Sequence, residues 1–485
     1  MTKLYSGLSS FLVIIMLAIG IPLPTQTGIA ATPPLPNCRF GITVPKNMTG
    51  IDISPFRIGA MLNWGIVGSL PSFTGVEFIN VLRVGDRCFD NQGHQTTCSL
   101  PDNPSPYQES LDTYQALVTA HPGMAWSIGN EPDTARSIQD DVTAEVYATR
   151  YYTIATGIRA IDPTARLGFG AVVGMTPIRM RYLDRAWNQL VTLAGSPSAA
   201  SALIDFWGPH NFLLNETPGG WGSDVPPGFG NDHADAVKIT NFGDTYNISK
   251  FSARVKNFRA WMVGKGEQNK PLWITEYGSL FPPINRPGGP KTVHVTDAKT
   301  SAFMLKSFDF MLNTADTNTG LPSDNYKLVQ RWFWYSLDDF RYNYGGSLFD
   351  PSKSPPKITT VGTAFLNYLP KNNVSPEFHF SGAFGLRPDP ADSTKFLVDV
   401  KITNAGNSTQ APRIVVYEDS LNNAPYTQVN ALPVMGCGGK TNETISIPYP
   451  PITTGTHKIY LRMNMTAKYA QYPNTAISFD VPSFP

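Results

Sequence analysis

Short apolar runs alternate with helical segments between residues 39 and 370, and this alternation constrains the fold more than any other feature of the sequence. Each of eight runs has the length of a β-strand. Alternating strands and helices predict parallel strands, and eight of them predict a (β/α)8 TIM barrel with loop insertions. The eight runs are residues 39–44, 56–64, 76–84, 124–129, 166–171, 203–208, 271–276 and 328–335.

Two of the intervening segments have the clearest helical period. Apolar side chains recur at spacings of three and four over residues 141–161, and again over residues 296–312. The first of these helices is predicted to end at Asp162, because the residue before Pro163 avoids helical backbone angles.

The pattern changes after about residue 375, where a period of two replaces the helical period. Phe396, Val398 and Val400 lie at every second position, and similar runs follow nearer the C-terminus. Short alternating strands separated by turn residues predict a β-sandwich. We therefore divide the chain into a barrel at residues 38–372 and a small accessory β-sandwich at residues 375–485.

The N-terminus has the organisation of an export signal. Lys3 precedes an apolar run at residues 11–19, and Gly28 and Ala30 supply small residues for a cleavage site. We predict a signal peptide over residues 1–30, a secreted protein and no membrane span after cleavage, because a span needs roughly 20 apolar residues. An uncleaved membrane anchor is the alternative.

Four cysteines permit disulfides in an exported protein. Cys88 and Cys98 lie close together in a polar stretch, so we expect them to pair. Cys38 and Cys437 are then left to join the start of the mature chain to the C-terminal module, although four cysteines allow three pairings. No CxxC or HxxxH spacing occurs, and we predict no metal site.

The charge composition argues against several classes of partner. Charged residues make up 15% of the chain and the formal net charge is +1. This balance does not favour a nucleic acid, an anionic membrane or a strongly acidic substrate. Nor does any feature of the sequence require a second copy, and we expect a monomer.

Two of the predicted strands end in a glutamate. Glu131 follows the fourth apolar run and Glu276 ends the seventh. Because the carboxyl ends of barrel strands open on one face, both side chains are expected to point into one pocket. Two carboxylates about 5 to 5.5 Å apart cleave a glycosidic bond with retention. That chemistry needs a raised pKa at the acid and an ionised nucleophile, while a salt bridge is the alternative role for either glutamate alone.

Both glutamates lie in segments that resemble a known group of enzymes. Residues 126–132, with Asn130, Glu131 and Pro132, resemble the fourth-strand Asn-Glu-Pro signature of clan A glycoside hydrolases. Residues 273–278 are similar to the seventh-strand nucleophile segment of that clan. The resemblance implies a (β/α)8 fold and a retaining mechanism, with Glu131 as acid/base and Glu276 as nucleophile. It also implies that Asn130 binds the 2-hydroxyl of the sugar.

Two more segments extend the resemblance, which covers roughly residues 39–370. Residues 204–212 look like the sixth strand of the clan, and imply that His210 lines the site; a buried core histidine is the alternative. Residues 331–335 resemble the eighth strand, where a tryptophan forms the floor of the sugar subsite. Trp332 and Trp334 share a face, and we choose Trp334 because it lies nearer the carboxyl end.

The ends of the second and third strands supply further candidates. Asn63 with the adjacent Trp64, and Arg83, are candidate sugar ligands there, with a structural role as the alternative for each. The short region before the fourth strand also resembles compact family 128 β-1,3-glucanases.

These features predict a secreted retaining glycoside hydrolase that acts on a neutral poly- or oligosaccharide without a metal or organic cofactor. The alternative is a non-catalytic carbohydrate-binding or cell-surface protein on the same barrel. A metal-dependent lyase or hydrolase is disfavoured by the missing ligand spacings. We expect the sandwich to brace the barrel rather than bind carbohydrate, because no row of aromatic residues stands out in its sequence.

Overall fold

The computed structural model of the protein describes residues 36–44, 48, 51–64, 75–85, 88–89, 95–96, 114–135, 139–281, 295–339, 344–368, 374–448, 457–463 and 476–480. The predicted signal peptide and the predicted pairing of Cys88 with Cys98 lie outside what is described. Among the helices of the described ranges, none has the length and apolar character needed to cross a lipid bilayer.

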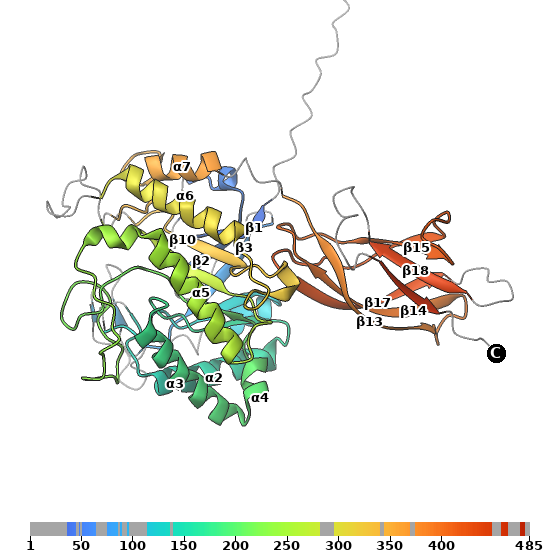
Figure 1. Ribbon diagram of the computed structural model, residues 1–485, viewed down its shortest axis with the longest axis horizontal. Helices are drawn as coiled ribbons and strands as arrows, with labels where there is room; N and C mark the ends of the chain where they lie inside the picture. The colour runs from blue at the N-terminus through green and yellow to red at the C-terminus, as the bar shows by residue number, and fades with distance from the viewer. Residues whose placement is uncertain are drawn as a thin grey trace, which may run out of the picture. The chain divides into compact units, whose positions relative to one another are not determined.

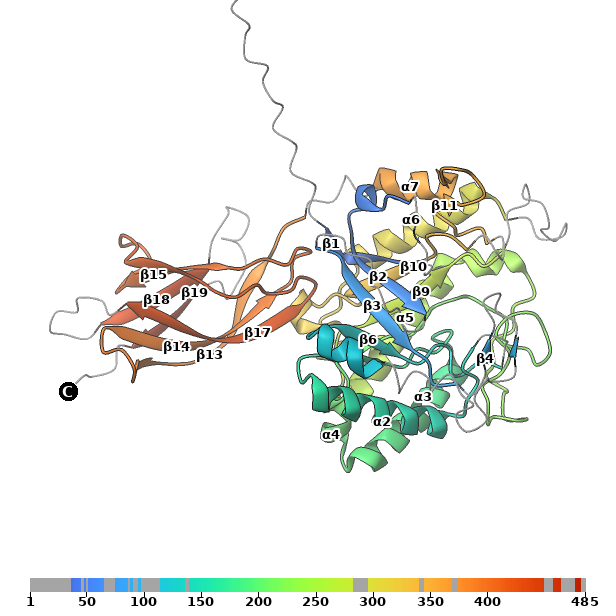
Figure 2. The same ribbon diagram turned by 180° about the vertical axis from the view of Figure 1, so that it is seen from behind.

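A ring of eight parallel strands with helices around it forms the first part of the chain (Figures 1 and 2). Hydrogen-bonded neighbours follow the order β8-β7-β6-β3-β2-β1-β10-β9. A parallel bridge between Trp207 and Leu272 joins β8 to the residue before β9 and closes the ring. The predicted (β/α)8 barrel is therefore confirmed. Its strands are β1 (Asn37–Thr43), β2 (Ile58–Trp64), β3 (Glu77–Leu82), β6 (Ala125–Ile128), β7 (Arg166–Phe169), β8 (Phe206–Trp207), β9 (Trp273–Gly278) and β10 (Arg331–Tyr335).

Both predicted helices are present on the outside of the barrel. They are α2 (Ala144–Ile161) and α6 (Asp297–Asn313), and Asp162 ends α2 with extended backbone angles. Their apolar faces pack against the strands in one large core. The other helices are α3 (Pro177–Ala194), α4 (Pro197–Ala202), α5 (Ile248–Gly264), α7 (Thr360–Tyr368) and residues 114–120, with short 3-10 helices η1 (Ser54–Phe56), η2 (Phe242–Tyr246) and η3 (Pro322–Asp324).

Aromatic and aliphatic side chains together fill the interior of the barrel. Phe206 and Trp273 stack with 3.8 Å between ring centroids, and Phe333 belongs to the same buried cluster. These rings need glycine on the neighbouring strands. A Cβ atom at Gly41 would lie 2.4 Å from the ring of Phe333, and one at Gly168 would lie 2.2 Å from that of Phe206. Because the interior is filled, space for a ligand is confined to the rim of the barrel.

Two antiparallel sheets form the C-terminal part, as predicted. Phe396, Val398 and Val400 are fully buried in a core of their own, which explains their alternation in the sequence. One sheet contains β13 (Phe378–Pro388), β14 (Lys395–Asn404) and β17 (Gly439–Pro448), and the other contains β15 (Arg413–Glu418), β16 (Thr427–Asn430), β18 (Lys458–Met463) and β19 (Ala476–Asp480). The described residues also form two short antiparallel pairs of strands. These are β4 (Cys88–Phe89) with β5 (Gln95–Thr96), and β11 (Phe349–Asp350) with β12 (Lys357–Ile358).

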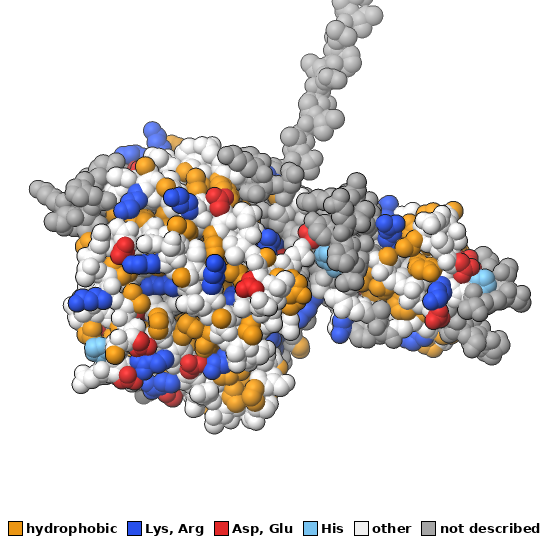
Figure 3. Space-filling view, viewed as in Figure 1, with side chains coloured by type: hydrophobic (Ala, Val, Ile, Leu, Met, Phe, Trp, Pro, Cys, Tyr) orange, Lys and Arg blue, Asp and Glu red, His pale blue; other side chains and the backbone are white. Residues whose placement is uncertain are grey.

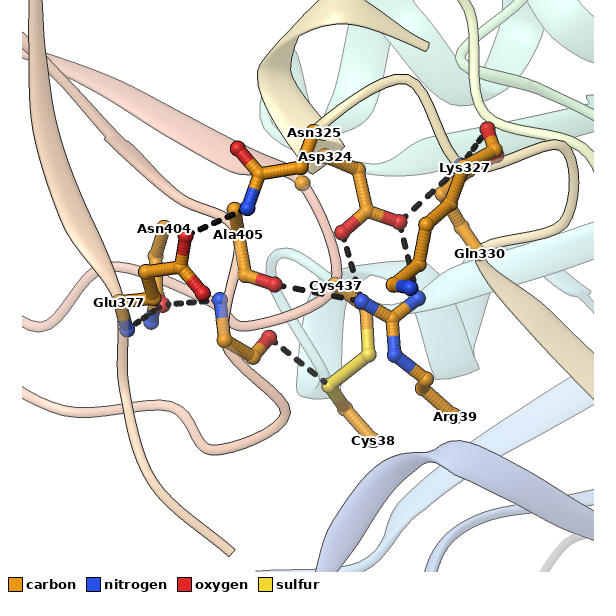
Figure 4. Close-up of polar contacts among 12 residues, drawn as sticks. Cys38, Arg39, Asp324, Asn325, Lys327, Gln330, Glu377, Asn404, Ala405 and Cys437 are labelled. Carbon is orange, nitrogen blue, oxygen red and sulfur yellow. Dashed lines mark hydrogen bonds and ion pairs between the residues drawn. A yellow bond between two sulfur atoms is a disulfide. The ribbon is translucent and has the colours of Figure 1, made fainter. Parts of the chain in front are cut away.

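A disulfide and a hydrogen bond join β1 to loops of the sandwich (Figure 4). Cys38 and Cys437 form a disulfide across 399 residues of sequence. Beside it, the buried guanidinium of Arg39 donates to both carboxylate oxygens of Asp324, at 2.8 and 2.6 Å. It also donates to the carbonyl of Ala405 at 3.2 Å. The pairing of Cys38 with Cys437, which the sequence left open, is thus present, and these contacts fit a bracing role for the sandwich.

We expect the double substitution Cys38→Ser and Cys437→Ser to lower the free energy of unfolding by about 2 to 5 kcal/mol, because the disulfide closes a long loop in the unfolded chain. Urea unfolding of both proteins without reductant measures the difference, and the unsubstituted protein in reductant serves as the control. Equal unfolding midpoints in all three samples would show that the bond does not brace the fold.

Candidate active site

Glu131 lies just beyond the carboxyl end of β6, where the chain leaves the barrel. Its φ angle is 45°, in the left-handed region that residues other than glycine rarely adopt. The backbone N–H of Glu131 donates to the carbonyl of Ala171 at 2.9 Å. The N–H of Asn130 donates to the carboxylate of Asp140 at 2.7 Å. Neighbouring loops therefore hold this turn and fix the direction of the buried Glu131 side chain.

Glu276 lies at an irregularity in β9. The register of β9 advances three residues, from Ile274 to Tyr277, while the paired strand β10 advances two. Strict alternation from Trp273, which faces the interior, would turn Glu276 toward the helices. The extra residue acts as a β-bulge and turns Glu276 to the rim instead.

His210 connects the two carboxylates. It follows β8, and its backbone N–H donates to the carbonyl of Val172 at 2.8 Å. Its Nδ1 lies 3.0 Å from Oε1 of Glu131, and its Nε2 lies 3.7 Å from Oε1 of Glu276. One oxygen of each glutamate and a ring nitrogen of His210 all lie within 4.8 Å of one another. The structure thus brings these three candidates together, and all three are buried.

Burial and like charge control protonation at this site. Burial raises the pKa of Glu276 to about 7; His210 and a hydrogen bond from Trp64 oppose the shift, while repulsion by Glu131 adds to it. Burial lowers the pKa of His210, but the charges of Glu276 and Glu131 outweigh burial and the net pKa is raised. From the sequence we expect an ionised Glu276, whereas burial favours its protonated form below about pH 7. The protonation of Glu276 and that of His210 therefore depend on each other.

Two aromatic residues lie close to Glu276: Trp64, which the sequence offered beside Asn63, and Tyr335, which it did not single out. Trp64, at the end of β2, donates its indole N–H to Oε1 of Glu276. Tyr335, at the end of β10, has its ring centroid 5.4 Å from that of Trp64 and 5.8 Å from that of Phe212. Its hydroxyl donates to Asp339. Both rings are only half-buried, so they offer an apolar surface beside the carboxylates.

Trp334 and Asn63 lie away from the carboxylates, which corrects our expectation for both. Trp334 is fully buried between the strands and the helices, and Asn63 is almost fully buried. Each donates a hydrogen bond to a backbone carbonyl, at 2.8 and 2.6 Å. Successive side chains of a strand point to opposite faces. The next residues in the chain, Tyr335 and Trp64, consequently occupy the rim.

Asn130 and Arg83 lie beside the turn that carries Glu131. The side-chain amide of Asn130 donates to Gln139 at 2.6 Å. Arg83 forms an ion pair with Asp140 at 2.5 Å, and Asp140 accepts the backbone N–H of Asn130. Arg83 therefore supports the turn through Asp140, and contact of either residue with a sugar stays a prediction.

Glu131, His210 and Glu276 are also of the residue types that bind divalent metals. Spacing along the chain did not reveal this group, because its members come from three different strands. However, Nδ1 of His210 lies 3.0 Å from Glu131 and Nε2 lies 3.7 Å from Glu276, so each ring nitrogen faces a different glutamate. The arrangement fits proton exchange between two carboxylates better than a metal site.

No family model and no curated protein matches this chain. Among solved structures, the chain is similar to an endo-β-1,4-mannanase from Thermotoga petrophila, at 12% identity and a TM-score of 0.36 over 92% of this chain and 97% of that chain. It is also similar to a glucosidase from Croceicoccus marinus, at 11% identity and a TM-score of 0.42 over 86% and 95%. A GH128 (subgroup VII) oligosaccharide-binding protein from Cryptococcus neoformans matches at 11% identity and a TM-score of 0.38 over 71% and 98%. Similarity at this level does not transfer a function, which has to be inferred from the site itself.

The raised pKa of Glu276 makes stability depend on pH. A rise from 4.5 to about 7 on folding means that the folded protein binds more protons between these values, so stability present below pH 4.5 is lost as the pH rises to 7. We expect Glu276→Gln, which cannot ionise, to gain up to about 3 kcal/mol relative to the unsubstituted protein across this window. Urea unfolding at pH 4.5 and pH 7 measures the gain.

Glu145→Gln is the matched control, because Glu145 lies on the exposed side of α2 and its pKa is lowered rather than raised. That variant should show no gain over the same window. An equal stability difference at both pH values for Glu276→Gln would mean that Glu276 is not forced toward its protonated form.

Proposed function

We propose that this protein is a glycoside hydrolase that cleaves O-glycosidic bonds with retention of configuration, with Glu276 as nucleophile and Glu131 as acid/base. The proximity of the two glutamates supports the proposal most directly, because an oxygen of each lies within 4.8 Å of the other. Retaining enzymes hold their carboxyl groups about 5 to 5.5 Å apart, whereas inverting enzymes leave about 6.5 to 9.5 Å for a water molecule.

The reaction uses one proton shared by the two glutamates. An oxygen of Glu276 attacks the anomeric carbon, while Glu131 gives its proton to the departing oxygen and the glycosidic bond breaks. Glu131 then takes a proton from water, the water oxygen attacks the anomeric carbon, and the bond to Glu276 breaks. The pair must therefore begin with one proton in total, and this proton must lie on Glu131.

His210 is well placed to control where that proton lies. It contacts Glu131 through Nδ1 and faces Glu276 through Nε2, so the imidazole lies on a path between the two carboxylates. The indole N–H of Trp64 stabilises the ionised form of Glu276 in addition. Substrate that displaces water from the rim strengthens these contacts, because the local dielectric constant falls.

Tyr335 takes the role that we first expected of Trp334, and forms the apolar floor under the sugar. Its ring is half-buried beside Trp64, next to the proposed nucleophile. Flat apolar rings of this kind stack on the C–H face of a sugar. Asn130 remains the candidate partner of the sugar 2-hydroxyl.

We also propose a neutral substrate and a place of action outside the cell. The formal net charge is +1, and on the barrel surface seen in Figure 3 Lys and Arg side chains lie among Asp, Glu and uncharged ones. A neutral poly- or oligosaccharide fits such a surface. The disulfide between Cys38 and Cys437 supports secretion, because disulfides persist in oxidising compartments.

Removal of the nucleophile tests the mechanism. We expect Glu276→Ala to lose hydrolysis by several orders of magnitude and to form a glycosyl azide of inverted configuration when azide is added, since azide fills the space of the carboxylate. Glu131→Ala with azide should instead give a glycosyl azide of retained configuration. NMR of products from a panel of activated aryl glycosides measures both outcomes.

Glu145→Ala is the control for these variants, and a chelator should leave the activity of the unsubstituted protein unchanged. The proposal is wrong if both Glu131→Gln and Glu276→Gln keep normal turnover. Binding of oligosaccharides without turnover by the unsubstituted protein would favour a carbohydrate-binding protein instead.

The floor of the subsite is tested by a pair of neighbouring residues. We expect Tyr335→Ala to lower kcat/KM about tenfold, or about 1.4 kcal/mol, because a stacked ring is lost. Trp334→Phe should lower thermal stability but leave kcat/KM close to that of the unsubstituted protein, since its ring faces the helices. A large loss of kcat/KM in Trp334→Phe and none in Tyr335→Ala would instead show that Trp334 forms the floor of the sugar subsite.

A further inference from the structure

Arg179, in the first turn of α3, is a fully buried arginine that uses all five of its N–H groups. Nε donates to Glu216 at 3.0 Å, and Nη1 donates to the carboxylate of Asp133 at 2.6 Å and to the Asp133 carbonyl. Nη2 donates to the hydroxyl of Ser223 at 3.0 Å and to the carbonyl of Asp224 at 2.5 Å. A planar guanidinium is the one side chain that can make this set of contacts at once.

These contacts join the two loops that carry Glu131 and His210. Asp133 lies two positions after Glu131, and its carboxylate also accepts the backbone N–H of Val173 at 3.1 Å. Glu216 lies in the loop that follows His210. Arg179 therefore connects the loop after β6 to the loop after β8, the same two loops that the hydrogen bond between His210 and Glu131 joins.

Further bonds strengthen the same connection. The hydroxyl of Thr134 donates to the carbonyl of Ser223 at 2.6 Å, again from the first loop to the second. The other oxygen of Glu216 accepts the backbone N–H of Val237 at 2.6 Å, and Thr176 donates to Glu216 at 2.6 Å. The two carboxylates that face Arg179 are both almost fully buried, so removal of its charge would take away the one cation that forms an ion pair with both of them among the described residues.

We infer that Arg179 is a positioning residue for acid/base catalysis, which sets the Glu131 carboxyl against His210 and the departing oxygen by holding the two loops together. This inference rests on the proposed glycosidase function. Arg179 itself touches neither glutamate at the rim in any contact of the described residues. Its effect should therefore appear when the departing oxygen needs a proton from Glu131, and not when the leaving group departs without one.

Leaving groups of different basicity separate these two cases. A dinitrophenyl glycoside departs without a proton, whereas the phenyl glycoside of the same sugar needs help from the acid. We expect Arg179→Met and Arg179→Lys to lower kcat/KM for the phenyl glycoside on the order of 10²-fold, the low end of the effect of general acid catalysis. For the dinitrophenyl glycoside, kcat/KM should stay near that of the unsubstituted protein.

Arg181→Met is the matched control, because Arg181 lies two positions later on α3 and pairs at the surface with Asp232 and Asp235. Arg181→Met should leave the ratio of kcat/KM for the dinitrophenyl glycoside to kcat/KM for the phenyl glycoside unchanged. If Arg179→Met does not fold, Glu216→Gln provides the test. This substitution keeps the shape of the side chain but weakens the contact of Arg179 with the second loop. It should lower kcat/KM for the phenyl glycoside more than for the dinitrophenyl glycoside.

Equal losses on both substrates, or no loss on either, in the folded variants would overturn the positioning role. An unsubstituted protein that is inactive on all aryl glycosides would instead contradict the proposed function, whatever the variants do. The positioning role of Arg179 is therefore tested by the variants, and the proposed glycosidase function by the unsubstituted protein.

Discussion

Two carboxylates that lie close together and out of water repel each other. One of them therefore keeps a proton, unless a positive charge lies nearby. Glu131 and Glu276 are in this position, and burial and repulsion raise the pKa of Glu276. His210 contacts both glutamates and so keeps one proton within reach of either. The chemistry that we propose needs a pair with a single proton, and burial, with repulsion between the carboxylates added to it, favours that state.

The barrel holds this pair against its own repulsion. A closed ring of parallel strands places the ends of β6 and β9 on the same rim, and a filled interior keeps ligands at that rim. The bulge in β9 turns Glu276 inward, while the buried contacts of Arg179 hold the loops that carry Glu131 and His210. Such close-packed support around a strained turn is what allows Glu131 to keep a left-handed backbone angle.

Much of this could be predicted from the sequence, because apolar runs of strand length mark all eight strands and both glutamates stand at the ends of such runs. The choice of Trp334 and Asn63 was wrong for one reason: a strand pattern does not say which face of a fully buried strand is the inner one. A shift by one residue gives Tyr335 and Trp64. The bulge in β9 and the contacts of Arg179 depend on pairing and on residues far apart in the chain, so no local pattern reports them.

A covalent trap tests the central claim most directly. A 2-deoxy-2-fluoro glycoside with a dinitrophenyl leaving group, of the sugar that the protein cleaves, should inactivate it and add one fluoroglycosyl group. Mass spectrometry of the digested protein should then find that group on Glu276. An adduct on another residue, or hydrolysis that releases the inverted sugar without any adduct, would contradict the retaining mechanism and the role given to Glu276.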